Sequence, residues 1–323
     1  MKVTLDVDTG SDDAVAIMLA ALHPDLELVG CTTVCGNLPV EVCTDNTLRV
    51  LDAIGRSDVP VHSGLGAPIG PARLHHGPDP GKRTGHLVHR AKFAAPPTSL
   101  RTAETGAVEY LLETYRRPSD VVLVATAPLT NLAAALILDP AIAANVPELV
   151  IMGGGHEVGN VTPAAEANIW HDPAAAAIVL SAGFPRLTLV TLDATHRALV
   201  SAADCDELAA SGTAAATLAA VLIRERIEGY AKTQPMAVPN TAPVHDPLCL
   251  AYLVDPNVLR LTRANVVVEQ TGEYTYGRTV IDTHDRSGRP AGADVALDAD
   301  ADLFVRLLRS TLTTPPLCRG GSA

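Results

Sequence analysis

Short apolar runs alternate with longer, partly amphipathic stretches along most of the chain. Apolar runs of roughly four to eight residues rich in Val, Ile and Leu are typical of parallel strands covered on both faces, and the stretches between them are typical of the covering helices. The expected strands are 1–7, 26–34, 59–63, 120–126, 148–152 and 187–193. The expected helices are 14–22, 40–55, 102–117, 129–138, 174–183, 248–253 and 302–312, with a long helical region over 202–229. This succession predicts an α/β fold.

The pattern changes near the C-terminus, where polar and apolar residues alternate over 258–270 and 273–282 around a Thr-Gly pair. Alternation on both sides of a glycine-containing turn predicts antiparallel strands. We therefore expect one Rossmann-like α/β domain over residues 1–313, with a central, mostly parallel sheet flanked by helices and antiparallel strands near the C-terminus. The Pro- and Gly-containing tail 314–323 is expected to be disordered.

Charge and composition exclude some classes of binding partner. The formal net charge is -12 and no run of Lys and Arg forms a basic stripe, so nucleic acid and anionic membranes are not expected partners. No basic segment followed by an apolar one opens the chain, and apolar stretches such as 14–22 are too short to span a bilayer. We expect a cytoplasmic protein that forms a homodimer or homotetramer. The scattered cysteines are expected to be buried free thiols; they are Cys31, Cys35, Cys43, Cys205, Cys249 and Cys318.

The periodic pattern disappears between residues 64 and 100, where Pro, Gly, His, Lys and Arg dominate. A loop of this length in a compact domain is usually a lid or a binding loop. Histidines scattered in loops are usually solvated, and His76 is the candidate for a functional role among His75, His76, His86 and His89.

The first expected strand runs into an acidic turn, Asp6-Val7-Asp8-Thr9-Gly10-Ser11-Asp12-Asp13. Asp6 and Asp8 share one side of the strand because side chains alternate along it. Carboxylates gathered this closely repel one another unless a cation, protons or hydrogen-bond donors hold them. Asp12 and Asp13 could simply cap the following helix, but capping cannot account for Asp6 and Asp8 as well. The turn therefore predicts a metal site or an acid/base site.

Three further motifs follow later strands. Asn37 comes after Gly36 at the carboxyl end of a strand, where ligands bind in open α/β sheets. The glycines of 153–155 form neither a complete Walker A motif nor a complete dinucleotide fingerprint. They indicate only that the backbone approaches some ligand closely. Asp246 precedes a proline and is either an ordinary helix cap or a site residue, and His245 is either a satisfied loop histidine or part of the same site.

With these motifs in this order, residues 3 to about 255 resemble the inosine-uridine preferring nucleoside hydrolase family. The motifs that carry the resemblance are Asp6 to Asp13, Gly36-Asn37, Ala127-Pro128-Leu129-Thr130-Asn131, Met152-Gly153-Gly154-Gly155, Glu166-Ala167-Asn168 and His245-Asp246-Pro247.

The resemblance implies a role for each matching residue. It implies Ca²⁺ held by Asp8, Asp13, Asp246 and the backbone carbonyl of Thr126, with Asp8 also positioned to take the proton of the metal-bound water. The substrate-binding residues that it implies are Asp12, Asn37 and Asn168 for ribose hydroxyls, Asn160 and Glu166 for the 5′-hydroxyl, and Met152 in the glycine motif. It places His245 near the leaving base. The chemistry agrees independently, because carboxylates with a carbonyl oxygen form a hard oxygen shell that suits Ca²⁺.

The implied function is calcium-dependent hydrolysis of the N-glycosidic bond of purine or pyrimidine ribonucleosides, which serves nucleoside catabolism and salvage. Thr9, Ala127 and Ala167 depart from the residues usual in the family, and the loop 76–85 matches only in part, which leaves the base preference open. One alternative is a haloacid-dehalogenase-type phosphatase that uses Asp6 and Asp8, although the later acidic pair of that superfamily is not found. The other is a nucleoside- or ribose-binding protein without catalysis.

Overall fold

The computed structural model describes residues 1–70 and 93–314. The loop histidines that include His76, and the tail after residue 314, lie outside this part of the chain. The predictions made for them stay predictions.

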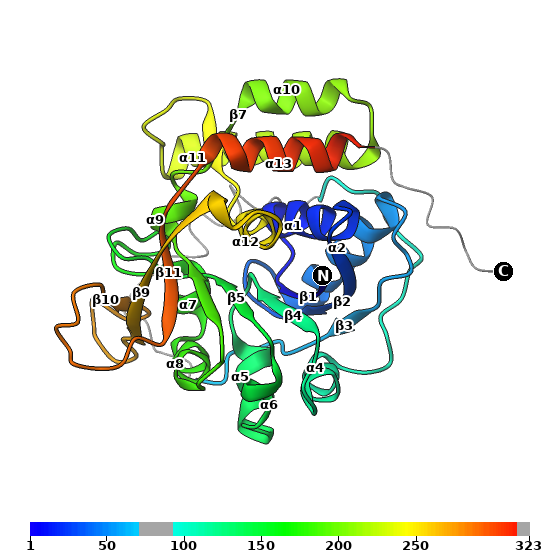
Figure 1. Cartoon of the computed structure of the whole chain (residues 1–323). Helices are drawn as coiled ribbons and strands as arrows, with labels where there is room; N and C mark the ends of the chain where they lie inside the picture. Colours follow the sequence, from blue (N-terminus) through cyan, green and yellow to red (C-terminus); the bar gives the residue numbers. More distant parts are fainter. Residues whose placement is uncertain (71–92, 315–323) are drawn as a thin grey trace.

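Within the described residues, nine strands form one sheet in the order β10-β9-β11-β6-β5-β4-β1-β2-β3 (Figure 1). Its strands are β1 (Lys2–Val7), β2 (Glu27–Thr33), β3 (Val61–Ser63), β4 (Val121–Ala125), β5 (Leu149–Met152), β6 (Leu187–Val190), β9 (Leu259–Val268), β10 (Thr279–Asp282) and β11 (Ala293–Ala299). Pairing is parallel from β3 through to β11, whereas β9 pairs antiparallel with β11 and β10. A separate antiparallel pair joins β7 (Leu199–Ser201) and β8 (Thr241–Pro243). The predicted fold class is confirmed.

Helices cover both faces of the sheet (Figure 1). One face carries α1 (Ser11–Leu22), α2 (Val40–Ala53), α12 (Pro247–Val254) and α13 (Ala301–Thr313), with α10 (Ala202–Ala210) and α11 (Ala214–Thr233) beyond them. The other face carries α4 (Ala107–Tyr115), α5 (Thr130–Leu138), α6 (Ile142–Asn145) and α8 (Pro173–Ser181). The short helices α7 (Ala167–His171) and α9 (Leu192–Thr195) and the 3₁₀ turn Pro256–Val258 lie in connections.

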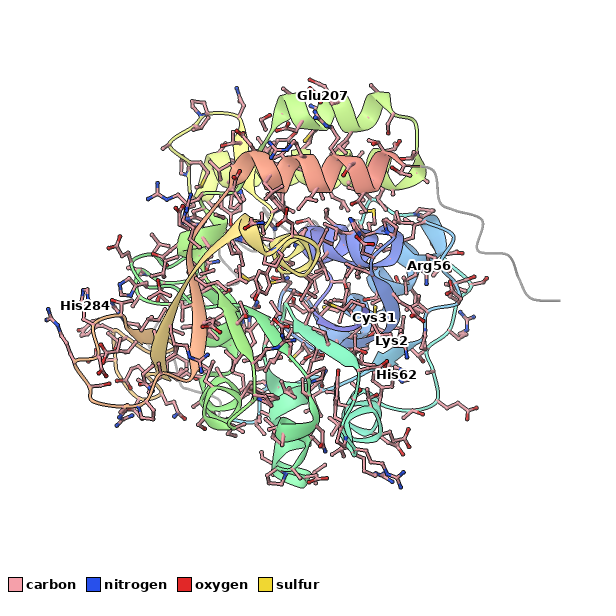
Figure 2. All side chains as sticks on the ribbon, in the orientation of Figure 1. Lys2, Cys31, Arg56, His62, Glu207 and His284 are labelled. Carbon is pink, nitrogen blue, oxygen red and sulfur yellow. The ribbon has the colours of Figure 1, made fainter. Side chains whose placement is uncertain are left out.

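The two-sided burial of the central strands explains their continuous apolar sequence. In β4, Val122 and Val124 pack into the core on one face, while Leu123 and Ala125 pack into the core on the other. Both alternating sets of side chains are therefore withdrawn from water, and no polar position interrupts the run. Polar side chains such as Glu207 and His284 lie at the periphery, whereas Cys31 lies inside (Figure 2).

Several boundaries differ from the sequence prediction. Residues 192–195 form the helix α9 instead of continuing the strand 187–193, because the chain turns at Thr191, whose backbone carbonyl accepts the N–H groups of Ala194 and Thr195. The predicted helical region 202–229 is divided at Gly212, whose φ of +74° does not continue a right-handed helix.

One helix begins later in the chain than predicted, and one strand is not predicted by the sequence. The predicted helix 102–117 begins only at Ala107, and β11 was not predicted at all. In the described chain no helix is both long enough and apolar enough to cross a membrane. Cys31, Cys43, Cys205 and Cys249 are buried free thiols, as predicted, and Cys35 is a half-buried one.

Candidate active site

The acidic turn places carboxylates at the carboxyl end of β1 and at the start of α1. Helix α12 packs against α1 and brings Asp246 to the same place (Figure 1). One carboxylate oxygen each of Asp12, Asp13 and Asp246 lies within 4.8 Å of the others. All three side chains are buried, with exposed fractions of 5%, 0% and 3%. The tertiary structure thus joins the two acidic motifs that the sequence indicated separately.

Asp13 is held by two donors from opposite sides. The Thr126 hydroxyl donates to Oδ1 over 3.0 Å, and the Gly10 backbone N–H donates to Oδ2 over 3.1 Å. Burial and the charge of Asp12 nevertheless raise the pKa of Asp13 to about 7. A positive partner beside Asp13 would therefore favour its ionised form at neutral pH.

Asp8 lies at the edge of this cluster. Its Oδ2 accepts the backbone N–H of Asn37 over 2.6 Å, and a Cβ atom at residue 36 would collide with that oxygen, so Gly36 is required there. Its Oδ1 is buried and accepts no hydrogen bond from a described residue. Burial, together with the charge of Asp13, raises the pKa of Asp8 well above its usual value. An unpaired buried carboxylate oxygen next to other carboxylates fits a cation site.

A comparison of Asp246 with Asp172 decides between the two interpretations left open by the sequence. Both residues precede a proline at the first position of a helix. Asp172 caps its helix, because its side chain accepts the N–H of Ala175 over 3.1 Å. The side chain of Asp246 accepts no such bond from the described backbone, and burial with the charge of Asp12 raises its pKa well above its usual value. Asp246 is therefore not a capping residue but a member of the acidic cluster.

The residues expected to bind ribose surround the same point. The Asn168 side-chain amide donates to the backbone carbonyls of Thr126 and Met152 over 2.8 and 3.2 Å. Glu166 caps α7 and accepts the backbone N–H of Gly154 over 3.0 Å, and burial raises its pKa to about 7.

Two further residues that are expected to bind the sugar make hydrogen bonds within the protein. Asn160 Oδ1 accepts the N–H of Ala167 over 2.9 Å, which leaves its amide N–H groups as the donors toward a ligand. Asn37 is half-buried, and its backbone N–H is the one that holds Asp8. The roles of these residues toward a sugar stay predictions.

His245 is held from both sides. Its Nε2 lies 2.6 Å from the Tyr230 hydroxyl, and its Nδ1 lies 2.7 Å from Thr195 Oγ1. The Thr195 hydroxyl also reaches the carbonyl of Leu192 over 3.3 Å, which favours a proton on Nδ1. His245 is 5% exposed, so it is not a solvated loop histidine.

Asp6 lies apart from the cluster, in a set of bonds of its own. Its Oδ1 accepts from the Thr32 hydroxyl over 2.7 Å and from the Asn131 amide over 2.9 Å, and burial raises its pKa to about 6. Asn131 also accepts the N–H of Leu65 over 3.0 Å and donates to the carbonyl of Thr33 over 2.9 Å. Its Oδ2 is buried and accepts no hydrogen bond from a described residue. Asp6 is not among the carboxylates that converge within 4.8 Å, and the bonds of its Oδ1 tie β1 to β2 and α5.

Sequence reasoning missed two residues of the site. Thr195 lies just beyond the predicted strand 187–193, and no local signal marks it. Arg226 lies in a polar stretch of α11 that looks solvated, but its side chain is 2% exposed and its Nη1 lies 2.8 Å from Asp12 Oδ1. The apolar residues one helical turn away on either side, Leu222, Ile223 and Tyr230, were the available signal that Arg226 faces inward.

Known proteins share this fold over nearly its whole length. The family model described as inosine-uridine preferring nucleoside hydrolase matches residues 3–306. The pyrimidine-specific ribonucleoside hydrolase RihA of Salmonella arizonae is 36% identical, over 97% of this chain and 98% of its own. A plant nucleoside hydrolase, PpNRh1, and a purine-preferring ribonucleoside hydrolase from Gardnerella vaginalis each superpose with a TM-score of 0.86 at 29% identity, covering 97% of this chain and 99% and 98% of theirs.

The fold and the buried acidic site are thus those of a metal-dependent nucleoside hydrolase. The chain belongs to the inosine-uridine preferring nucleoside hydrolase family. The predicted family and the prediction of a hydrolase that acts on N-glycosyl compounds are confirmed.

The raised pKa values predict how the stability of the metal-free protein depends on pH. Free carboxyl groups have a pKa of about 4, whereas Asp13 and Glu166 have a pKa of about 7 in the fold. The folded state therefore binds more protons than the unfolded chain between these values, and its stability falls as the pH rises from about 5 to about 7.

Saturating Ca²⁺ should reduce this loss, because a cation that binds the ionised folded state stabilises it by mass action. Thermal melts across this pH range, with a chelator and with Ca²⁺, measure the difference. Identical pH slopes under both conditions would contradict a cation site at these carboxylates.

Proposed function

We propose that this protein is a Ca²⁺-dependent ribonucleoside hydrolase, which cleaves the N-glycosidic bond and releases ribose and the free base. The observation that carries the proposal is the convergence of Asp12, Asp13 and Asp246 within 4.8 Å, next to Asp8, in a fully buried position at the carboxyl end of the sheet. Buried carboxylates whose pKa is raised in the free protein suit a hard divalent cation with oxygen ligands.

The residues proposed to hold the ion are Asp8, Asp13, Asp246 and the carbonyl of Thr126. When bound, Ca²⁺ supplies a Lewis acid that orients a water and lowers its pKa. Asp8 accepts the proton of the attacking water through Oδ1, the oxygen that has no hydrogen bond from a described residue. The ionised carboxylates around the sugar stabilise the positive charge that develops on the ribose during cleavage.

Binding groups distant from the broken bond orient the sugar. We propose Asp12, Asn37 and Asn168 for the ribose hydroxyls, and Asn160 and Glu166 for the 5′-hydroxyl. Asn168 is preset for this role, because its bonds to the carbonyls of Thr126 and Met152 fix its amide. A polar group that is already held in place loses little freedom when the sugar binds, and the reactive pose is populated more often.

The departing base needs a proton, and His245 is proposed to provide it. Its hydrogen bonds to Thr195 and Tyr230 fix the ring, and the bond to Tyr230 links it to a second ionisable group, the tyrosine hydroxyl. Both ring nitrogens are engaged in this geometry, so the base would take its proton from the Tyr230 hydroxyl, which would be reprotonated by the imidazolium form of His245, or from that imidazolium directly once its contact with Tyr230 breaks.

Ribose release from inosine, uridine and adenosine, with and without Ca²⁺, tests the proposal. A parallel assay with a phosphate monoester tests the haloacid-dehalogenase alternative, which would need Asp6 as a nucleophile; Asp6 is fully buried and its Oδ1 already accepts two hydrogen bonds. The same three nucleosides reveal the base preference. Binding of nucleoside without ribose release would instead support a non-catalytic binding protein.

Ribonucleosides should be cleaved much faster than 2′-deoxyribonucleosides. A 2′-deoxyribonucleoside lacks the hydroxyl that the buried Asp12 carboxylate should bind, so one charged hydrogen bond is not formed. Such a bond contributes about 1.5 to 3 kcal/mol, or roughly ten- to a hundredfold in kcat/KM. The ratio of kcat/KM for inosine to that for 2′-deoxyinosine measures this effect. Equal values would argue against a ribose-binding role for Asp12.

A further inference from the structure

Arg226 is a buried positive charge beside the acidic cluster. Its Nη1 lies 2.8 Å from Asp12 Oδ1 and donates to Ser11 Oγ over 3.1 Å. The side chain is 2% exposed, and Asp12 itself is 5% exposed. A buried guanidinium is costly unless it is paired, so this contact gives Arg226 its counter-charge and gives Asp12 a partner that persists without any ligand.

The guanidinium is held by one contact with β8 and by one with a residue of its own helix. Nε donates to the carbonyl of Pro243 in β8 over 3.0 Å, and the guanidinium carbon lies 5.4 Å from the centroid of the Tyr230 ring. Arginine presents its donors in a rigid planar fork, so fixing Nε also fixes Nη1. The position of Nη1 beside Asp12 is therefore set by β8 and by Tyr230, and not by Asp12 alone.

Asp12 lacks the hydrogen bonds that hold Asp13. Asp13 accepts hydrogen bonds on both oxygens, from Thr126 and Gly10. Asp12 Oδ1 accepts no hydrogen bond from a described residue, and Arg226 is its ion-pair partner there. Without Arg226, repulsion from Asp13 and Asp246 would act on Asp12 unopposed at that oxygen.

We propose that Arg226 is a positioning residue that holds the Asp12 carboxylate in place for a ribose hydroxyl, and thereby sets the preference for ribose over 2-deoxyribose. This inference rests on the proposed function, in which Asp12 binds the sugar. A purely structural role, such as tying α11 to β8 through Pro243, would slow every substrate alike. A positioning role changes the ratio between the two sugars.

The test compares Arg226→Gln with Arg224→Gln on the same helix. Arg224 pairs with Asp206 at the surface and serves as the matched control. For Arg226→Gln, the ratio of kcat/KM for ribonucleoside to that for 2′-deoxyribonucleoside should fall roughly ten- to a hundredfold, the size of one charged hydrogen bond, whereas Arg224→Gln keeps the wild-type ratio. An unchanged ratio in Arg226→Gln overturns the inference, even if both rates drop.

A double-mutant cycle shows whether Arg226 acts through Asp12. In the Asp12→Asn background, Arg226→Gln should lower the ratio no further, because the carboxylate that it positions is gone. A second, additive fall would overturn the inference. Should Arg226→Gln fail to fold, Arg226→Lys keeps the charge but loses the fork, and the ratio should then fall severalfold; an unchanged ratio in this variant also overturns the inference.

A binding measurement separates this inference from the proposed function. Calorimetry of ribose and 2-deoxyribose binding to Ca²⁺-loaded wild type and Arg226→Gln requires no turnover. Wild type should bind ribose more tightly, and the variant should lose most of that difference. If wild type releases no ribose from any nucleoside, the proposed function fails, while the sugar-binding result still supports or overturns the role of Arg226.

Discussion

Replacing Asp13 by Asn should reduce ribose release by about a hundredfold to several thousandfold. Removing one partner of a buried ion pair typically costs about 3 to 5 kcal/mol, and we expect a loss of this size if Asp13 is a partner of the proposed cation, which corresponds to that range in rate. Asp13 is fully buried, and burial raises its pKa to about 7 in the metal-free protein, so its negative charge is costly there without a cation.

The Asp13→Asn substitution removes the negative charge but should leave the fold unchanged. Asn can direct its carbonyl oxygen toward the Gly10 N–H and its amide toward the Thr126 hydroxyl, which can accept, so both contacts of Asp13 are retained. The start of α1 should therefore survive, and the lost activity should trace to the missing negative charge. A melting temperature close to that of metal-free wild type would verify this.

The matched control is Asp45→Asn, which removes the same charge from an exposed ion pair with Arg49 on α2. This variant should keep wild-type activity, since exposed pairs contribute little and Asp45 lies outside the site. Thorough chelation of wild type should reproduce the loss seen in Asp13→Asn, and added Ca²⁺ should restore only wild type. Full activity in protein shown by elemental analysis to be metal-free would refute the metal site.

His245→Ala should slow the cleavage of natural nucleosides by about a hundredfold or more, which is the usual scale of general acid catalysis. An activated riboside whose leaving group is a stable anion, such as 4-nitrophenyl riboside, needs no proton, and the same variant should cleave it almost as fast as wild type. Steady-state rates on both substrates provide the comparison.

Two further variants sharpen this test. His284→Ala removes an exposed histidine at the edge of the fold and should change neither rate (Figure 2). Tyr230→Phe keeps the ring but removes the hydroxyl that lies 2.6 Å from His245 Nε2. If Tyr230→Phe slows the cleavage of natural nucleosides as much as His245→Ala does, the proton passes through the tyrosine. If Tyr230→Phe slows it only slightly, His245 acts on the base directly.

Disturbance of Asp246, the proposed metal ligand next to His245, would give a different result. If His245→Ala merely displaces Asp246, both substrates slow together and the affinity for Ca²⁺ falls. Measuring both rates and Ca²⁺ affinity on one preparation distinguishes these outcomes. Parallel losses would make His245 a structural neighbour of the acidic cluster, and the acid would then be sought at Tyr230 or at His76.

The sequence by itself determined the parts of this protein that depend on near neighbours along the chain. Continuous apolar runs such as 120–126 identified the central strands, because a strand covered on both faces has no polar positions. The acidic turn identified the carboxylates of β1 and α1, and the order of the motifs identified the family. Each of these motifs spans only a few residues, and neither the motifs nor their order depends on which segment packs where.

The tertiary structure alone decided which residues act together. Thr126 meets Asp13 across 113 positions of sequence, Arg226 meets Ser11 across 215, and Thr195 meets His245 across 50. It also separated Asp6 from the acidic cluster and showed that Asp246 is no helix cap. Periodicity reports which face of an element is buried, but the partner on that face is set by the packing of whole helices and strands. For this reason the apolar neighbours of Arg226 on its helix could indicate that it faces inward, but not that Asp12 is its partner.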